Sequence, residues 1–398
     1  MEPITTTDTL AAFCARQSQA PFITVDTEFL RDDTYWPQLC LVQVGGPSEE
    51  AAIDTLAPGL DLAPLLDLLR ARSVLKVFHA ARNDLEIFYQ LMDGALPEPV
   101  FDTQMAAMVC GFGDQVGYNT LVQSVTGTKI EKTERFTDWS RRPLSAQQIE
   151  YALADVTYLR DIYAMLRDRL AENGRASWLD EEMAALTDPS TYAMDPETAA
   201  QRVKPRSNDR KYLTLLRAVA IWREREAQRR DMPRNRLLRD EQIHDIAAQA
   251  PRNTAQLART RGVSEGTARG AVGQSILAAV DEALAVPANE RPRRGPRPDQ
   301  LPKRLAPMVE LLKVLLKTKS EAHGVAQKLI ASGGDLERIV GEDQPDVPAL
   351  RGWRYEIFGK DALALKRGDL ALAAGQKGVR LISLAQDAGT PAQTPPNA

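Results

Sequence analysis

Cysteine is scarce in this sequence, with three residues in 398. Cys14, Cys40 and Cys110 are odd in number, far apart and not spaced as metal ligands, so we expect free thiols in a reducing cytoplasm. Long apolar runs are lacking as well, because no stretch approaches the roughly 18–20 residues that cross a bilayer. The first ten residues are polar and acidic, without the basic start and apolar core of a signal peptide. We therefore expect a cytoplasmic protein, and no membrane is implied.

Charge is unevenly distributed along a chain of otherwise ordinary globular composition. Hydrophobic residues make up 43% and charged residues 26%, and a chain of this length is expected to form two or three domains. The net charge of −4 alone does not point to a polyanionic partner. Residues 201–300, however, contain 21 basic and 12 acidic side chains, a local charge of +9, while the rest of the chain carries −13. One interpretation is an acidic part that holds metal and a basic part that binds phosphates; a solvated basic helix face is the other.

Two kinds of periodicity divide the chain near residue 172. Before it, β-branched or apolar runs predict strands at 22–29, 38–45, 50–54, 74–78 and 99–101. Helical spacing in the same part predicts helices at 61–71, 81–92, 103–110 and 145–172. After it, short helices are expected at 211–230, 240–249, 254–260 and 266–285. This order indicates an antiparallel meander followed by βα units, and therefore a mixed α/β sheet with flanking helices, followed by all-α domains.

Composition also suggests where the domains end. Linkers are expected at 188–206 and at 288–302, the second rich in proline and arginine. The predicted domains are an α/β domain, two all-α domains and a disordered tail, at 1–187, 207–287, 303–385 and 386–398. The two helical blocks have similar lengths, which is consistent with a diverged pair.

The most informative feature is an acidic pair on the first predicted strand. Asp26 and Glu28 follow the β-branched run 22–25, and side chains two residues apart lie on the same face of a strand. Two carboxylates held together on a core element repel each other and resist desolvation, unless a cation lies between them. A divalent metal is the expected cation. For an isolated Asp-x-Glu pair, an edge strand with both acids in water is the more ordinary explanation.

Two further acids lie on predicted helices of the same domain. Asp84 falls in the first turn of a helix that follows strand 74–78, where ligand sites of α/β sheets gather. An acid favoured by the helix dipole is the ordinary alternative. Asp155 lies four residues after Tyr151 on helix 145–172, so the two share one face among small apolar neighbours. An exposed Tyr/Asp pair is the alternative there.

Four acids, one pair on a strand and one on each of two helices, can converge on two divalent cations. Such cations activate a water and stabilise the leaving oxygen of a phosphodiester. Oxygen ligands favour Mg²⁺ or Mn²⁺ over zinc. Tyr151 is a poor base near neutral pH, so orienting the attacking water is its safer role. The three scattered histidines give little support to a histidine metal site or to Ser-His-Asp catalysis. A turn is expected for the glycine-rich segment 111–117, and helix capping for Asp102.

These motifs resemble those of a known family. In order and spacing, Asp26-Thr27-Glu28, Asn83-Asp84 and Tyr151-x-x-x-Asp155 are similar to the three motifs of the DEDDy 3′→5′ exonucleases. Neighbouring segments resemble the ribonuclease D family in particular: residues 34–43, His79-Ala80 and Asp138-Trp139-x-x-Arg142-Pro143-Leu144. The resemblance covers residues 20–170 and implies a ribonuclease-H-like exonuclease fold. It also implies that two metal ions, Mg²⁺ or Mn²⁺, are bound by Asp26, Glu28, Asp84 and Asp155, with Tyr151 positioning the nucleophilic water.

The same family implies substrate contacts and a second type of domain. The candidates for substrate binding are Gln38, His79, Trp139 and Arg142, all within the matching segments. The stretch from Leu213 to Gly262 resembles the helical HRDC domain, which this family shares with RecQ-type helicases. Residues 303–385 are then expected to be a second, diverged HRDC-type domain.

The expected function is a 3′-to-5′ exoribonuclease that releases 5′-nucleoside monophosphates, with tRNA 3′-end maturation as the process that the family suggests. RNA with a free 3′ end is the implied partner, and no protein partner is implied. A DNA 3′–5′ exonuclease of a repair pathway is one rival, since the metal chemistry does not depend on the 2′-OH. A catalytically silent RNA-binding adaptor is another, although degenerate copies usually lose an acid and all four are present here.

Overall fold

A computed structural model of the chain describes residues 2–130, 137–293, 301–376 and 378–384. The chain divides into two compact units, each built from separate segments. Unit 1 comprises residues 1–102, 128–161 and 183–298, and unit 2 comprises 103–127, 162–182 and 299–398. The continuous domain limits predicted from composition stay a prediction. Part of the predicted linker 288–302 and the whole predicted tail 386–398 lie outside the described residues.

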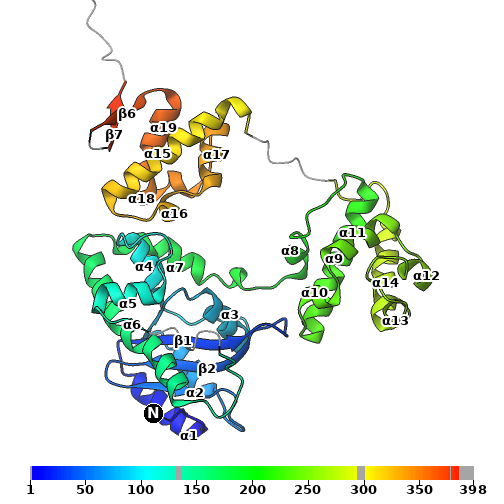
Figure 1. The fold of residues 1–398 in the computed structure, drawn as a ribbon, viewed down its shortest axis with the longest axis horizontal. Coiled ribbons are helices and arrows are strands. Elements are labelled where there is room, and N and C mark those ends of the chain that lie inside the picture. Colours follow the sequence, from blue (N-terminus) through cyan, green and yellow to red (C-terminus); the bar gives the residue numbers. More distant parts are fainter. Residues whose placement is uncertain (1, 131–136, 294–300, 377, 385–398) are drawn as a thin grey trace, which may run out of the picture. The chain divides into compact units, whose positions relative to one another are not determined.

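Unit 1 contains a five-stranded mixed sheet (Figure 1). Its strands are β1 (Phe22–Leu30), β2 (Gln38–Gly45), β3 (Glu50–Ile53), β4 (Leu75–Phe78) and β5 (Val100–Asp102), in the order β3-β2-β1-β4-β5. β2 runs antiparallel to β1 and β3, whereas β4 runs parallel to β1 and β5. The predicted meander followed by βα units is confirmed, and each predicted strand is present to within one residue at either end.

Helices cover both faces of this sheet (Figure 1). On one face lie α1 (Thr7–Gln17), α2 (Ala63–Arg70) and α3 (Arg82–Leu91), whose Leu10, Leu65 and Phe88 share a buried cluster with Val25 of β1. The other face is covered by α6 (Ala146–Glu172), whose Ala152 packs with Leu41 and Ala52. Because side chains alternate along a strand, Asp26 and Glu28 lie on the α6 face. Helix α1 was not predicted, although its buried Leu10, Phe13, Cys14 and Gln17 have helical spacing.

Helix α6 approaches the sheet closely where β1 and β2 pair. The Thr24 hydroxyl donates to the carbonyl oxygens of Gly45 and Val156, at 3.1 and 2.8 Å. A Cβ atom on Gly45 would lie 2.6 Å from Thr24 Oγ1 and 3.3 Å from the Val156 side chain. Only glycine fits at this contact, which fixes α6 against the sheet one residue away from Asp155.

The basic middle of the chain folds as a group of helices, also in unit 1. They are α8 (Pro196–Ala200), α9 (Arg210–Arg230), α10 (Arg234–Leu237), α11 (Asp240–Gln249), α12 (Thr254–Leu257), α13 (Glu265–Arg269) and α14 (Ala271–Ala285). Their core includes Leu216, Ile243, Ile276 and Val280. The single helix predicted at 266–285 is wrong, because the chain becomes extended at Gly270 and forms two helices.

Unit 2 combines C-terminal helices with segments from the first half of the chain. Its elements include α4 (Thr103–Val109), α5 (Tyr118–Thr126), η1 (Ala176–Leu179), α15 (Ala306–His323), α16 (Gln327–Ile330), α17 (Gly333–Gly341), α18 (Gly352–Arg354) and α19 (Lys360–Arg367). The Trp178 and Trp353 rings stack at 4.3 Å, and buried Arg354 pairs with Glu181 at 2.6 Å. The segment after 303 is helical as predicted, apart from a hairpin of β6 (Leu370–Gly375) and β7 (Gly378–Ser383).

The cysteines agree with the expectation from composition. Cys14, Cys40 and Cys110 are buried and free, so the prediction of free thiols is confirmed. Within the described part of the chain, no helix combines the length and the apolar character needed to span a bilayer.

Candidate active site

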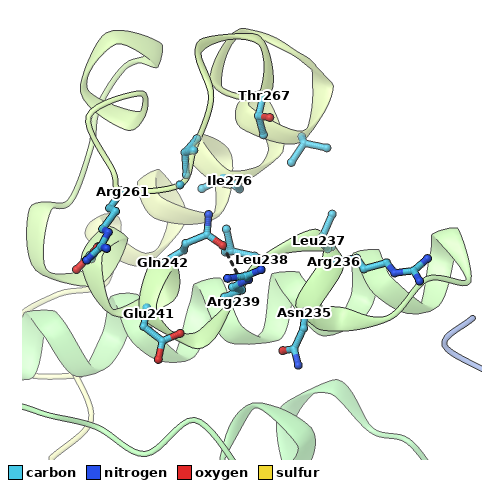
Figure 2. A pocket seen from close by; sticks show the side chains of 14 residues that line it. Asn235, Arg236, Leu237, Leu238, Arg239, Glu241, Gln242, Arg261, Thr267 and Ile276 are labelled. Carbon is cyan, nitrogen blue, oxygen red and sulfur yellow. Dashed lines mark hydrogen bonds between the residues drawn. The ribbon is translucent and has the colours of Figure 1, made fainter. Parts of the chain in front are cut away.

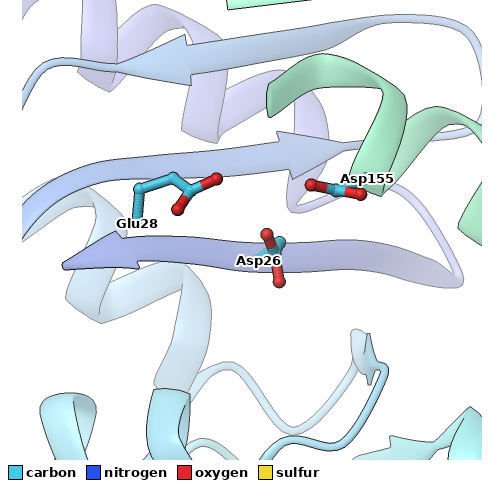
Figure 3. A group of neighbouring side chains, drawn as sticks. All are labelled: Asp26, Glu28 and Asp155. Carbon is cyan, nitrogen blue, oxygen red and sulfur yellow. The ribbon is translucent and has the colours of Figure 1, made fainter. Parts of the chain in front are cut away.

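Three carboxylates from two elements meet on the α6 face of the sheet. Asp26 and Glu28 project from β1, and Asp155 projects from α6 toward them (Figure 3). One carboxylate oxygen from each residue lies within 4.8 Å of the corresponding atoms of the other two. The strand alternation and the helix register predicted for these residues are therefore both correct, and the sheet contact of α6 brings them together.

Burial and mutual repulsion determine the electrostatics of this cluster. Burial raises the pKa of the Glu28 carboxyl to about 9, and the charges that act on it are all carboxylates, namely Asp26, Asp155 and Asp84. Burial raises the pKa of the Asp155 carboxyl to about 7. Burial and then repulsion from Asp155 raise the pKa of Asp26 well above its ordinary value. Such a group of acids strongly favours a bound cation over the charged, empty state.

The donor set fits a hard divalent cation. All of the converging atoms are carboxylate oxygens within a few ångströms of one another, which is the ligand type that Mg²⁺ and Mn²⁺ prefer. The edge-strand alternative is excluded, because β1 is the central strand of the sheet and its two acids face Asp155 of α6.

The fourth acid, Asp84, adjoins the cluster but is held separately. It lies in the first turn of α3, is 7% exposed, and accepts a hydrogen bond of 2.5 Å from Thr27 Oγ1. Burial and then the charge of Asp26 raise its pKa well above the ordinary value. Asp84 is therefore within electrostatic reach of Asp26, while Thr27 orients its carboxylate.

Asp102 orients the segment that carries Asp84. Its carboxylate accepts hydrogen bonds from the backbone N–H groups of Ala80 and Ala81, at 3.2 and 2.9 Å. Ala80 has a positive φ of 60°, which is costly for a residue with a Cβ. Asp102 therefore stabilises the turn before α3, whereas its predicted role as the cap of the helix that follows it in sequence stays a prediction.

Comparison with known proteins assigns a family to this arrangement. A family model described as 3′-5′ exonuclease matches residues 1–171, and an HRDC domain model matches residues 213–280. The ribonuclease D of Granulibacter bethesdensis (strain ATCC BAA-1260 / CGDNIH1) is 55% identical over 381 residues, which are 96% of each protein. The chain belongs to the ribonuclease D family.

Other members agree over nearly the whole chain. The ribonuclease D of Acidiphilium cryptum is 52% identical, covering 96% of this chain and 97% of that protein. The crystal structure of Escherichia coli RNase D, described as an exoribonuclease involved in structured RNA processing, matches with a TM-score of 0.79 and 31% identity, covering 92% and 98% of the two chains. The resemblance, fold class and activity predicted from the motifs are confirmed: the chain is a 3′-5′ exoribonuclease that uses divalent metal. A second HRDC-type domain at 303–385 stays a prediction.

The remaining sequence candidates of this ribonuclease D-family enzyme lie around the cluster. Tyr151 is one turn before Asp155 on α6, half-buried, with its ring 6.3 Å from that of Trp139. Gln38 is the exposed first residue of β2. His79 follows β4 and precedes the turn at Ala80.

Trp139 and Arg142 are occupied by contacts within the protein. Trp139 is 3% exposed and packs in the cluster that contains Leu41 and Ala152. The Arg142 guanidinium donates to both Asp54 carboxylate oxygens, at 2.8 and 2.6 Å, and to the carbonyl oxygen of Cys40. These contacts fix the segment before α6 onto the sheet.

Thr24, Thr27 and the exact role of Asp102 were missed by reasoning from the sequence. Thr27 lies between the two acids of the first motif, so the alternation of β1 already placed it on the opposite face, toward α3. Thr24 has the same parity as Asp26, which placed it under α6. Asp102 gave no such signal, because its partners belong to a different βα unit.

The HRDC region contains a cavity of about 810 Å³ (Figure 2). Basic side chains line it, together with an apolar part from Val263, Val272 and Ile276. The basic residues are Arg236, Arg239 and Arg261, and the acidic ones are Glu241 and Asp245. Arg236 pairs with Asp33, whereas the ion pairs found among the described residues do not include Arg239 or Arg261.

Proposed function

We propose that this enzyme shortens RNA from its 3′ end by two-metal-ion hydrolysis, releasing 5′-nucleoside monophosphates, and that tRNA precursors in the cytoplasm are among its substrates. The observation that supports the chemistry is the convergence of Asp26, Glu28 and Asp155 within 4.8 Å, where burial and the neighbouring carboxylates raise the pKa of Glu28. Either Mg²⁺ or Mn²⁺ suits these ligands.

Each acidic element has a distinct part in this proposal. When bound, two divalent ions would supply an activated water and stabilise the leaving oxygen of the phosphodiester. Asp26, Glu28 and Asp155 would hold one side of the site, and Asp84, oriented by Thr27, would complete it. Tyr151 would orient the attacking water, because it lies on the same helix face as Asp155 and one turn away.

The substrate contacts divide into direct and indirect ones. Gln38 is exposed at the start of β2, and His79 lies at the end of β4 beside α3. Both are proposed to contact the terminal nucleotides. Trp139 and Arg142 are proposed to contribute through the segment that they hold in place, since their own side chains are occupied.

The test is a nuclease assay on 5′-labelled RNA. A tRNA with a 3′ extension and a single-stranded DNA of the same sequence are incubated with Mg²⁺, Mn²⁺ or EDTA. We expect a ladder that shortens from the RNA 3′ end and disappears with EDTA and in Asp155→Asn. Asp161→Asn, an exposed aspartate on the same helix, is the matched control and should retain activity. Faster shortening of the DNA would contradict RNA as the preferred substrate, and RNA binding without shortening under either metal would contradict the proposed chemistry.

The HRDC cavity is a proposed binding surface for the RNA body. Residues 201–300 carry a local charge of +9, and Arg239 and Arg261 line a cavity that also offers apolar surface for a base. Neutralisation of phosphates by Lys and Arg supplies most of the sequence-independent affinity of proteins for nucleic acid.

A further inference from the structure

Gln43 is a buried polar residue whose side chain has no hydrogen-bond partner among the residues that the structure describes. It is 0% exposed, and neither its amide nitrogen nor its amide oxygen makes a hydrogen bond within the described structure. A buried, unpaired amide destabilises the folded state relative to an apolar side chain of the same size. Native proteins contain few such groups, and each one calls for an explanation.

Gln43 lies directly beside the metal-binding acids. In the register of the sheet it pairs with Asp26 on β1 and with Ala52 on β3. Residues opposite each other in an antiparallel pair point to the same face, with Cβ atoms roughly 4.5–5.5 Å apart. The long side chain of Gln43 therefore shares the α6 face with Asp26 and can reach its carboxylate.

The neighbours of Gln43 place it under the turn of α6 that carries Asp155. Leu41, two residues before it, packs in the cluster of Ala152, and Gly45, two residues after it, contacts Val156. Gln43 thus lies between two contacts that flank Asp155. Leu41, on the same face of β2, is buried with an apolar side chain. Packing under α6 therefore does not by itself require a polar residue at position 43.

We propose that Gln43 is a positioning residue of the metal site, whose side-chain amide donates a hydrogen bond to the Asp26 carboxylate when divalent metal is bound. A carboxylate is a strong acceptor for an amide N–H, and Asp26 is the acidic residue directly opposite Gln43 in the sheet. Groups that orient a metal ligand in this way commonly change metal affinity 10–100-fold when they are removed. The inference rests on the proposed two-metal chemistry.

The test measures metal binding and stability of the full chain separately. Mn²⁺ affinity is measured by EPR titration of the free ion, and the melting temperature is measured in EDTA. Gln43→Met keeps the side-chain length without the amide, and we expect about tenfold weaker Mn²⁺ binding with an unchanged or higher melting temperature in EDTA. Mn²⁺ affinity within twofold of the wild type would overturn the proposal, whatever the melting temperature.

Gln17 offers a matched control. It is also a buried glutamine, 3% exposed, but its amide donates to Glu49 at 2.6 Å, on α1 and away from the acids. Gln17→Met should lower the melting temperature and leave Mn²⁺ affinity unchanged, which shows that lost stability alone does not weaken metal binding.

A crystal structure of the wild type gives a second test, which does not depend on whether Gln43→Met folds. In a crystal structure of the wild type with Mn²⁺, Gln43 Nε2 should lie within about 3.2 Å of an Asp26 carboxylate oxygen. An amide bonded to another group, or to a water outside the ligand sphere, would overturn the inference. If the wild type binds no Mn²⁺ in the titration, it is the proposed two-metal function that fails.

Discussion

Thr27 donates a hydrogen bond of 2.5 Å from its hydroxyl to the carboxylate of Asp84. The donor lies between Asp26 and Glu28 on β1, yet its side chain points to the opposite face of the sheet, toward α3. One strand therefore supplies two acids of the proposed metal site on one face and orients a third acid from the other.

Removing this hydroxyl should weaken the site without removing a ligand. We expect Thr27→Val to lower kcat about tenfold, because Asp84 loses its donor and its carboxylate is no longer oriented. The free energy of unfolding should fall by about 1–2 kcal/mol. Thr27→Ser, which retains the hydroxyl, is the control. A kcat of the valine variant equal to that of the serine variant would contradict a role of the hydrogen bond.

Neutralising Glu28 should stabilise the protein while it inactivates the enzyme. Burial and neighbouring acids raise the pKa of Glu28 to about 9. At pH 8 the metal-free fold must therefore take up a proton that the unfolded chain does not hold, and this destabilises the fold. Glu28→Gln should raise the melting temperature in EDTA by roughly 2–5 °C and lower activity at least ~100-fold, about 2.7 kcal/mol of transition-state stabilisation. The exposed Glu150→Gln on α6 should change neither quantity. A lower melting temperature for Glu28→Gln would contradict this account.

The same pKa shifts predict how stability depends on pH. In the unfolded chain these acids titrate near pH 4, whereas in the fold the pKa of Asp155 is about 7 and that of Glu28 about 9. Between pH 5 and 8 the folded state therefore holds more protons than the unfolded state, and stability in EDTA should fall as pH rises. Mg²⁺ or Mn²⁺ must displace these protons, so the gain in melting temperature on adding metal should be larger at pH 8 than at pH 5.

A double variant separates this effect from other titrations. Glu28→Gln/Asp155→Asn should flatten the fall in melting temperature between pH 5 and 8 and remove the gain on adding metal. An unchanged slope in the double variant would assign the pH dependence to other groups, among them Asp26 and Asp84, whose pKa values burial also raises.

Asp102 should affect activity through the turn before α3. Asp102→Asn keeps one acceptor for the N–H groups of Ala80 and Ala81 and loses the other. We expect a loss of about 1–2 kcal/mol in the free energy of unfolding and about a tenfold lower kcat, because Asp84 lies in the helix that begins there. Asp195 also accepts two backbone N–H bonds, at the start of α8, so Asp195→Asn should lower stability and leave kcat unchanged. Similar kcat values for the two variants would contradict the coupling to Asp84.

The arginines that line the HRDC cavity should contribute to RNA binding. Arg239→Ala/Arg261→Ala should weaken binding of a tRNA precursor and reduce the slope of log K against log salt by about 1 for each phosphate that is no longer neutralised. Arg252→Ala is the control, since Arg252 lies outside the cavity and pairs with Asp281 at 3.2 Å. Trimming of a short single-stranded RNA should be less affected than trimming of the tRNA precursor. An unchanged salt slope in the double variant would exclude the cavity as a phosphate site.

Local patterns in the sequence were sufficient for the elements that carry the chemistry. Period-2 alternation placed Asp26 and Glu28 on one face of β1, and the helical period placed Tyr151 and Asp155 on one face of α6, because both depend only on backbone geometry. Helices were missed or given wrong limits where the helical pattern was weak or interrupted. The amphipathic spacing of α1 went unrecognised in a polar N-terminus, and Gly270 divided one predicted helix into two.

What the sequence by itself determined was the set of acids, their faces and, through the resemblance of the motifs, the family. Only the tertiary structure decided that three of these acids approach within 4.8 Å, that Asp102 caps a turn in another βα unit, and that Gln43 is buried beside Asp26 without a hydrogen-bond partner among the described residues. The reason is physical: these relationships join residues far apart in the chain, through strand pairing and the packing of Thr24 and Gly45 against α6. No local periodicity carries that information.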